Sequence, residues 1–233
     1  MGFLEHLEEL RIRLIKSLIA VLFGAIFSFG YINDILNILL QPTFNTSNPI
    51  NLISLKVQGM FIVKWTISFI SGLIIASPLL TYQFWKFIGP GLRVNEKRFA
   101  LPVVFFSFTS FILGILFGYF IIVPFSLEFF SAVSSDYVEN NFSIQYYFSF
   151  LIWLLLGTGL IFQLPVVSFI LSIIGVLTPA FMRHYRRHSI VIILIISSFI
   201  TPPDPLSMLI MSFPLLILYE LSIFISWMVN RKS

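Results

Sequence analysis

The sequence predicts an all-α, polytopic membrane protein with six transmembrane helices and with both the N- and C-termini on the cytoplasmic side. Of its 233 residues, 58% are apolar and only 10% are charged, and the mean hydropathy is +0.98. A soluble domain of this length carries about 25% charged residues, and 28 Phe side chains are too many for one core of this size. Long uncharged stretches recur, with Lys and Arg gathered between them. The solvent for most of this surface is therefore lipid.

Uncharged apolar stretches mark the expected spans. The stretch from Trp65 to Trp85 has 21 residues, about one bilayer crossing. The next is bounded by Arg98 and Glu128. We expect one membrane domain over residues 1–233, with spans at roughly 14–32, 62–88, 99–125, 146–176, 189–203 and 206–228.

The last two expected spans are short and are separated by the helix breaker Pro202-Pro203-Asp204-Pro205. The 15 residues from Ser189 to Pro203 reach about 22 Å as a helix, against a hydrocarbon thickness of about 30 Å. Either this pair thins the bilayer locally or it packs as a helical hairpin inside the bundle. Length alone does not separate the two interpretations.

The distribution of Lys and Arg predicts the topology. Twelve of the 14 lie in four clusters, and Lys56 and Lys64 are the exceptions. The clusters are Arg11, Arg13 and Lys16; Lys86, Arg93, Lys97 and Arg98; Arg183, Arg186 and Arg187; and Arg231 and Lys232. Basic residues favour cytoplasmic loops, so all four clusters should share one side. This requires the uncharged region from Asn140 to Met182 to cross once, which gives six spans. Asp136 then faces outward.

The first span could instead belong to a cleavable signal peptide. Three acidic residues, Glu5, Glu8 and Glu9, accompany its basic residues, and no A-x-A-like site follows it. Both features are atypical of signal peptides, so we expect a membrane span.

Polar groups within the spans are candidate functional sites, because each intramembrane charge costs at least a few kcal/mol. Glu220 lies in the sixth expected span. Instead of a functional site, it could be a structural carboxyl with polar neighbours or a group that snorkels to the interface. Gln163 could hydrogen-bond backbone carbonyls that Pro165 leaves without donors. Ser197, Ser198 and Thr201 form a polar patch whose hydroxyls more often bond their own i−4 carbonyls.

Several function classes lack their residues. There is no cysteine and no metalloprotease, serine-hydrolase or P-loop motif, and the sequence has no nucleic-acid-binding pattern. His184 and His188 have metal-ligand spacing, but three neighbouring arginines would repel a cation. We therefore expect no enzyme activity, cofactor, metal or nucleic acid. A small-solute secondary transporter stays open, although it would need buried charges on broken helices and Glu220 is thin support.

Five blocks stand in order along nearly the whole chain. The first is the run from His6 to Leu14, HLEELRIRL. The others are Ser77–Leu92 with Asn95–Arg98 after it, Phe162–Pro165, Thr201–Asp204 and Pro214–Glu220. Together they resemble the TatC family of the Sec-independent, twin-arginine protein translocase, whose opening signature is H-L-x-E-L-R-x-R-L. Six spans with both ends cytoplasmic is also the architecture that this resemblance implies.

The resemblance implies a receptor for folded cargo in a bacterial inner membrane or an organellar membrane, driven by the proton-motive force. Glu9 and Glu96 would bind the two arginines of a signal peptide, with Leu10, Arg11, Phe87 and Pro90 around them. Without the resemblance, Glu9 with Arg13 and Glu8 with Arg11 would be ordinary i+4 and i+3 salt bridges.

Partners are implied as well: TatA- and TatB-like single-span proteins, and further copies of the chain itself. Docking of the single-span partners falls on Ser198, Thr201, Asp204 and Met208, and Pro42 takes the place of a periplasmic-loop proline. Two positions depart from the family pattern: Gln163 stands where a Glu is frequent, and Met208 where a Gln is common.

Overall fold

The computed structural model describes residues 3–46, 50–88, 100–133, 141–201 and 205–231. The chain divides into two compact units. One comprises Met1–Leu40 and Ser54–Phe108, and the other comprises Gln41–Ile53 and Thr109–Ser233.

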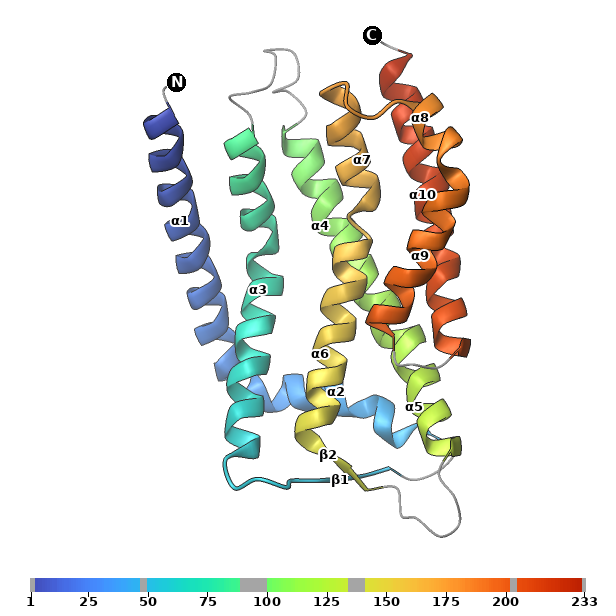
Figure 1. The fold of residues 1–233 in the computed structure, drawn as a ribbon. Coiled ribbons are helices and arrows are strands. Elements are labelled where there is room, and N and C mark those ends of the chain that lie inside the picture. The colour runs from blue at the N-terminus through green and yellow to red at the C-terminus, as the bar shows by residue number, and fades with distance from the viewer. Residues whose placement is uncertain (1–2, 47–49, 89–99, 134–140, 202–204, 232–233) are drawn as a thin grey trace. The chain divides into compact units, whose positions relative to one another are not determined.

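In the first unit, two long helices lie side by side, α1 (Phe3–Gly30) and α3 (Gly59–Ile88) (Figure 1). The charged N-terminal segment and the first apolar stretch form one continuous helix of 28 residues, α1. No residue interrupts this helix at the junction, since residues 3–30 contain no Pro and their first Gly is Gly24. The carboxylates of α1 are therefore rigidly continuous with its apolar part.

Small residues let α1 and α3 approach closely. The buried residues of α1 include Val21, Gly24 and Ser28, which are three or four positions apart and thus share a face. A Cβ atom added to Gly24 would lie 2.7 Å from the carbonyl oxygen of Gly72 on α3. Such contacts between small residues are typical of helix packing in membranes.

Helix α2 (Ile32–Phe44) follows α1 after a turn at Tyr31 and contains Pro42. Helix α4 (Ala100–Phe117) continues into the π-helical segment η3 (Gly118–Ile122) and α5 (Val123–Val133). Helix therefore extends eight residues beyond the expected end of the third span at residue 125.

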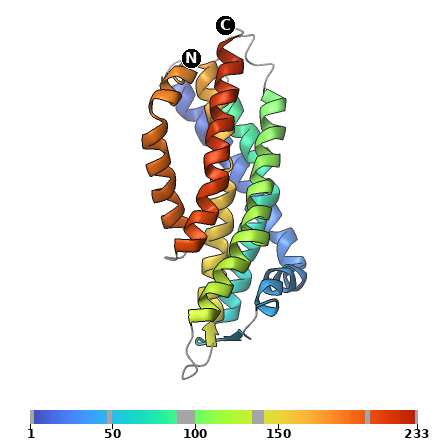
Figure 2. The same ribbon diagram turned by 90° about the vertical axis from the view of Figure 1, so that its right-hand side faces the viewer.

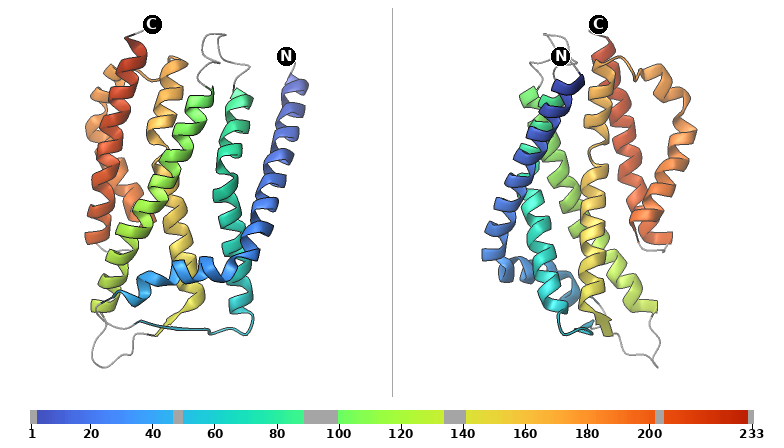
Figure 3. Two further views of the ribbon diagram at one scale, coloured as in Figure 1. Left: turned by 180° about the vertical axis from the view of Figure 1, so that it is seen from behind. Right: turned by 60° about the vertical axis from the view of Figure 1, so that its left-hand side comes forward.

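The second unit also contains α6 (Ile144–Ile161), α7 (Leu164–Ile173), α8 (Pro179–His184), α9 (Arg186–Ile200) and α10 (Pro205–Asn230). Helix α7 continues the direction of α6 after a break at Phe162 and Gln163 (Figure 1). Pro165 explains the break, because it lacks an N–H and its ring would clash with the carbonyl four residues earlier. Helix α9 runs beside α10 (Figures 2 and 3).

Two strands qualify the all-α prediction. β1 (Asn51–Ile53) pairs in parallel with β2 (Asn141–Ser143), with Leu52 opposite Phe142. Both lie outside the spans that the sequence predicts. Three residues each are too few to give a recognisable alternating pattern.

Within the described residues, five helical stretches are long and apolar enough to cross a membrane. They are Glu5–Gly30, Gly59–Phe87, Leu101–Ala132, Ile144–Ile173 and Pro205–Asn230. The expected fifth span corresponds to α9, which has only 15 residues. The expectation that the last span is also short is wrong: α10 has 26 residues, since Pro214 does not end it.

Candidate functional site

The candidate site lies where the charged first turns of α1 face the last turns of α3. Arg13 donates both Nε and Nη2 to the same oxygen of Glu9, Oε1, with Nε at 3.2 Å. Its remaining nitrogen, Nη1, donates to Oε1 of Gln83 on α3 at 3.4 Å. The side chain of Arg13 is only 12% exposed. Arg13 thus fixes the carboxylate of Glu9 and ties it to the neighbouring helix.

The second carboxylate oxygen of Glu9 is the unusual group in the site. Oε2 is shielded from solvent and has no hydrogen-bond partner among the described residues. Nδ1 of His6 lies 3.8 Å from it, which is too far for a hydrogen bond. Leaving a buried charged acceptor unpaired is costly, so Oε2 is ready to accept a donor.

An aromatic face adjoins this oxygen. The ring of His6 stacks on Phe87 of α3, with ring centroids 4.4 Å apart and planes 16° apart. Carboxylate, imidazole and phenyl ring thus lie in a row from α1 to α3. A planar cation would find both a negative oxygen and an aromatic surface here.

The remaining predicted site residues divide into two groups. Leu10 is half-buried, and Arg11 is exposed and contacts Glu8 at 3.4 Å. Pro90 and Glu96 lie outside the described residues. The structure therefore brings Glu9 and Phe87 to one place, while the part played by Glu96 stays a prediction.

The intramembrane candidates have structural partners. Glu220 on α10 accepts a hydrogen bond from Arg186 on α9 at 2.7 Å, with both side chains about half exposed. The hydroxyl of the adjacent Tyr219 donates to the carbonyl of Met182 at 2.7 Å. Glu220 thus helps to join α9 to α10. Gln163 stands at the N-cap position of α7, and its backbone carbonyl accepts from Val167 N–H at 2.9 Å.

The expected partner-docking residues occupy different environments. Thr201 is buried and donates to the carbonyl of Ser197 at 2.8 Å, the intrahelical bond that the sequence suggested as an alternative. Ser198 is exposed on α9, and Met208 is half-buried on α10. Asp204 lies outside the described residues, and Pro42 is buried in α2.

Sequence reasoning did not assign His6, Arg13 and Gln83 to the site. The spacing of Glu9 and Arg13 did signal their salt bridge. The contact with Gln83 spans 70 positions, and no local pattern reports it.

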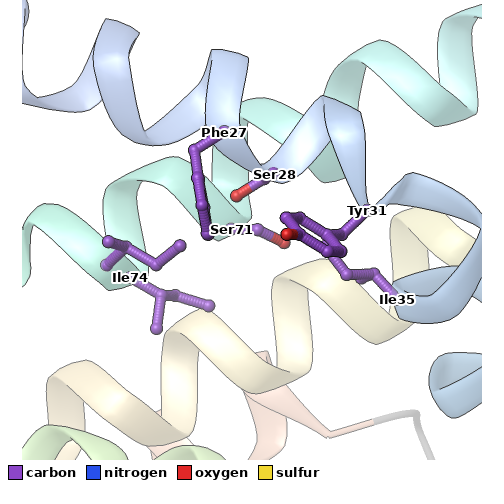
Figure 4. A pocket seen from close by; sticks show the side chains of 7 residues that line it. Phe27, Ser28, Tyr31, Ile35, Ser71 and Ile74 are labelled. Atoms are coloured by element: carbon purple, nitrogen blue, oxygen red, sulfur yellow. The ribbon is translucent and has the colours of Figure 1, made fainter.

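A groove near the other end of α1 is a different kind of feature (Figure 4). It measures about 340 Å³ and is lined mainly by apolar side chains, with Ser28 and Ser71 as small polar groups. Such a lining offers nothing to balance a charge. Among the described residues, no group of three or more His, Asp or Glu could hold a metal ion.

These features define a class: a multi-pass helical membrane protein with a recessed carboxylate between its first two long helices. The model of the family "Sec-independent protein translocase protein (TatC)" matches residues 5–214. The chain belongs to the TatC family.

Similar proteins and solved structures support this family assignment. The Aquifex aeolicus protein named TatC is 38% identical over 235 residues, covering all of this chain and 98% of the relative. The Carboxydothermus hydrogenoformans TatC is 36% identical, covering all of this chain and 96% of that one. A crystal structure described as the twin arginine translocase receptor TatC superimposes with a TM-score of 0.82. The two sequences are 37% identical, and the superposition covers 97% of this chain and 99% of the chain in that crystal structure. The chain is a multi-pass membrane protein, and these bacterial relatives indicate the bacterial inner membrane.

Proposed function

We propose that this chain is the receptor subunit of a twin-arginine translocase, which binds the twin-arginine signal peptides of folded precursor proteins. The observation that carries the proposal is Glu9, whose Oε1 is fixed by Arg13 while Oε2 lacks a hydrogen bond among the described residues. A carboxylate held in this way is matched to an incoming guanidinium, which pairs with carboxylates in a defined plane. The similar receptor of known structure supports the same function.

The second arginine of the signal would pair with Glu96. Both carboxylates then serve one bound motif, with Leu10, Arg11, Phe87 and Pro90 around it. A lysine would meet the same charge but could not reproduce the planar fork, and its ammonium is more strongly hydrated. Discrimination between Arg-Arg and Lys-Lys signals follows from this geometry.

Transport requires a topology and partners. We propose six spans with α9 as the short fifth one and with both termini cytoplasmic, so that Glu9 and Glu96 face the same compartment. TatA- and TatB-like single-span proteins would dock near Ser198, Thr201, Asp204 and Met208, and copies of this chain would associate in the receptor complex. With no nucleotide-binding motif, movement of cargo would draw on the proton-motive force rather than on turnover here. Small-solute transport is not favoured, because its main support, Glu220, is paired with Arg186.

Signal-peptide binding tests the proposal. We expect Glu9→Gln and Glu96→Gln each to weaken binding of a fluorescent Arg-Arg signal peptide to the purified protein by about tenfold or more, since a charge-assisted bond is lost. The double variant should be weaker by less than the product of the two effects, because one motif contacts both groups. Glu8→Gln is the matched control, since Glu8 is exposed and pairs with Arg11. Unchanged affinity in both single variants would refute the proposal, as would equal binding of a Lys-Lys signal.

A further inference from the structure

We propose that His6 is an internal placeholder for the signal arginine: its ring occupies the surface of Phe87 beside Oε2 of Glu9, and the signal guanidinium displaces it. This inference rests on the proposed function and adds a residue that sets the affinity of the arginine site.

The geometry of the three groups carries the inference. The imidazole lies parallel to the Phe87 ring at 4.4 Å and 16°, the arrangement that a guanidinium adopts on an aromatic face. Its Nδ1 points to within 3.8 Å of Oε2. A planar nitrogen-bearing group thus already stands where a planar cation would both stack and approach the carboxylate.

The placeholder fits the position incompletely. The 3.8 Å separation leaves Oε2 without a hydrogen bond among the described residues. Arg13 does not supply one, because its Nε and Nη2 point to Oε1 and its Nη1 points to Gln83. A signal guanidinium could stack on Phe87 and also donate to Oε2, so the exchange gains a charge-assisted bond.

The exchange is also accessible. The side chain of His6 is 44% exposed, and it belongs to the first turn of α1, so it can rotate away without disturbing a core. An aromatic pair contributes modestly to stability. A signal arginine can therefore displace the His6 ring from Phe87, but the lost stack still lowers its affinity. His6 therefore reduces the affinity for weak ligands that cannot replace its stack.

The test measures binding of the Arg-Arg signal peptide to full-length protein in detergent or nanodiscs. His6→Ala and the more conservative His6→Gln should both tighten binding by about two- to tenfold, the range expected for one aromatic pair. His6→Arg should weaken it by about tenfold or more, since a tethered guanidinium then competes for Glu9. His184→Ala, on α8, is the matched control and should have no effect.

A coupling measurement excludes a merely structural role. In a Glu9→Gln background, His6→Arg should no longer weaken binding, because the competing guanidinium has lost its carboxylate. If Glu9→Gln weakens binding but His6→Ala and His6→Gln leave it unchanged or weaken it, the placeholder is overturned and the receptor proposal stands. If Glu9→Gln leaves binding unchanged, both are overturned.

Discussion

Arg13 shows how one residue determines the state of another. Its Nε and Nη2 converge on a single carboxylate oxygen of Glu9, and Nη1 reaches Gln83 on the neighbouring helix. Lysine has one point charge and could not make these contacts at once. The orientation of Glu9, and with it the position of Oε2, therefore depends on the shape of the guanidinium as well as its charge.

We expect Arg13→Lys to lower the thermal midpoint of the detergent-solubilised protein by roughly 2–4 °C, as for a small loss of stability in a chain of this size. The reason is the lost link from Glu9 to Gln83. Arg11→Lys is the matched control, because Arg11 pairs with Glu8 on an exposed surface, where such pairs contribute little. Equal midpoints for the two variants would show that Arg13 has no fixing role.

Sequence reasoning reached some of these residues and missed others for a physical reason. The spacing of Glu9 and Arg13 is local, so their pairing was predictable. Glu220 was expected as an intramembrane carboxyl whose neighbours were unknown. Its partner Arg186 is 34 positions away, and they meet only because α9 folds back alongside α10.

At the scale of elements, the packing of α1 on α3 depends on backbone approach rather than on large side chains. Gly24 and Gly72 face each other so closely that a Cβ on Gly72 would lie 2.7 Å from the Cα atom of Ala25. Because lipid is as apolar as Leu, such contacts stabilise the pair through van der Waals packing. This pair positions Glu9 of α1 opposite Gln83 and Phe87 of α3.

We expect Gly24→Ala or Gly72→Ala to destabilise the protein by about 1–3 kcal/mol, because an overpacked contact forces the helices apart. The signal-peptide affinity should fall in parallel, since Glu9 and Phe87 lie on different helices. Gly30→Ala is the matched control: nothing lies within 4 Å of a Cβ there. Thermal unfolding in detergent measures the first effect, and a loss in Gly30→Ala as large as in Gly24→Ala would contradict the explanation.

Element boundaries were less predictable than the elements themselves. Uncharged stretches predict where lipid surrounds the chain, but a helix can extend past such a stretch, as α1 does towards Phe3 and α5 towards Val133. Helix α2 and the two strands lie outside the predicted spans, where hydropathy carries little signal. The break before α7 falls inside the expected span 146–176 and is explained by Pro165, whereas Pro214 is accommodated within α10.

For the whole molecule, composition predicted a multi-pass helical membrane protein correctly because few charged residues leave no alternative to lipid. The number of crossings is a separate question, since α9 has 15 residues and spans about 22 Å. The clusters of Lys and Arg predict the number of crossings independently of helix length. Arg186 and Arg187 begin α9, whereas Lys56 and Lys64 flank the beginning of α3.

The topology yields the last prediction. Because basic residues favour the cytoplasmic side, we expect Arg186, Arg93 and the C-terminus to face the cytoplasm and Val57 and Asp136 to face outward; Arg93 and Asp136 lie outside the described residues. The chain has no cysteine, so single cysteines at these positions give an unambiguous signal. A membrane-impermeant maleimide added to intact cells should label Val57→Cys, which is fully exposed, and should label Arg186→Cys only after the membrane is opened. Labelling of both before opening would place the ends of α9 differently and remove the case for six spans. Reversed labelling would put Glu9 on the wrong side to meet a signal peptide before transport.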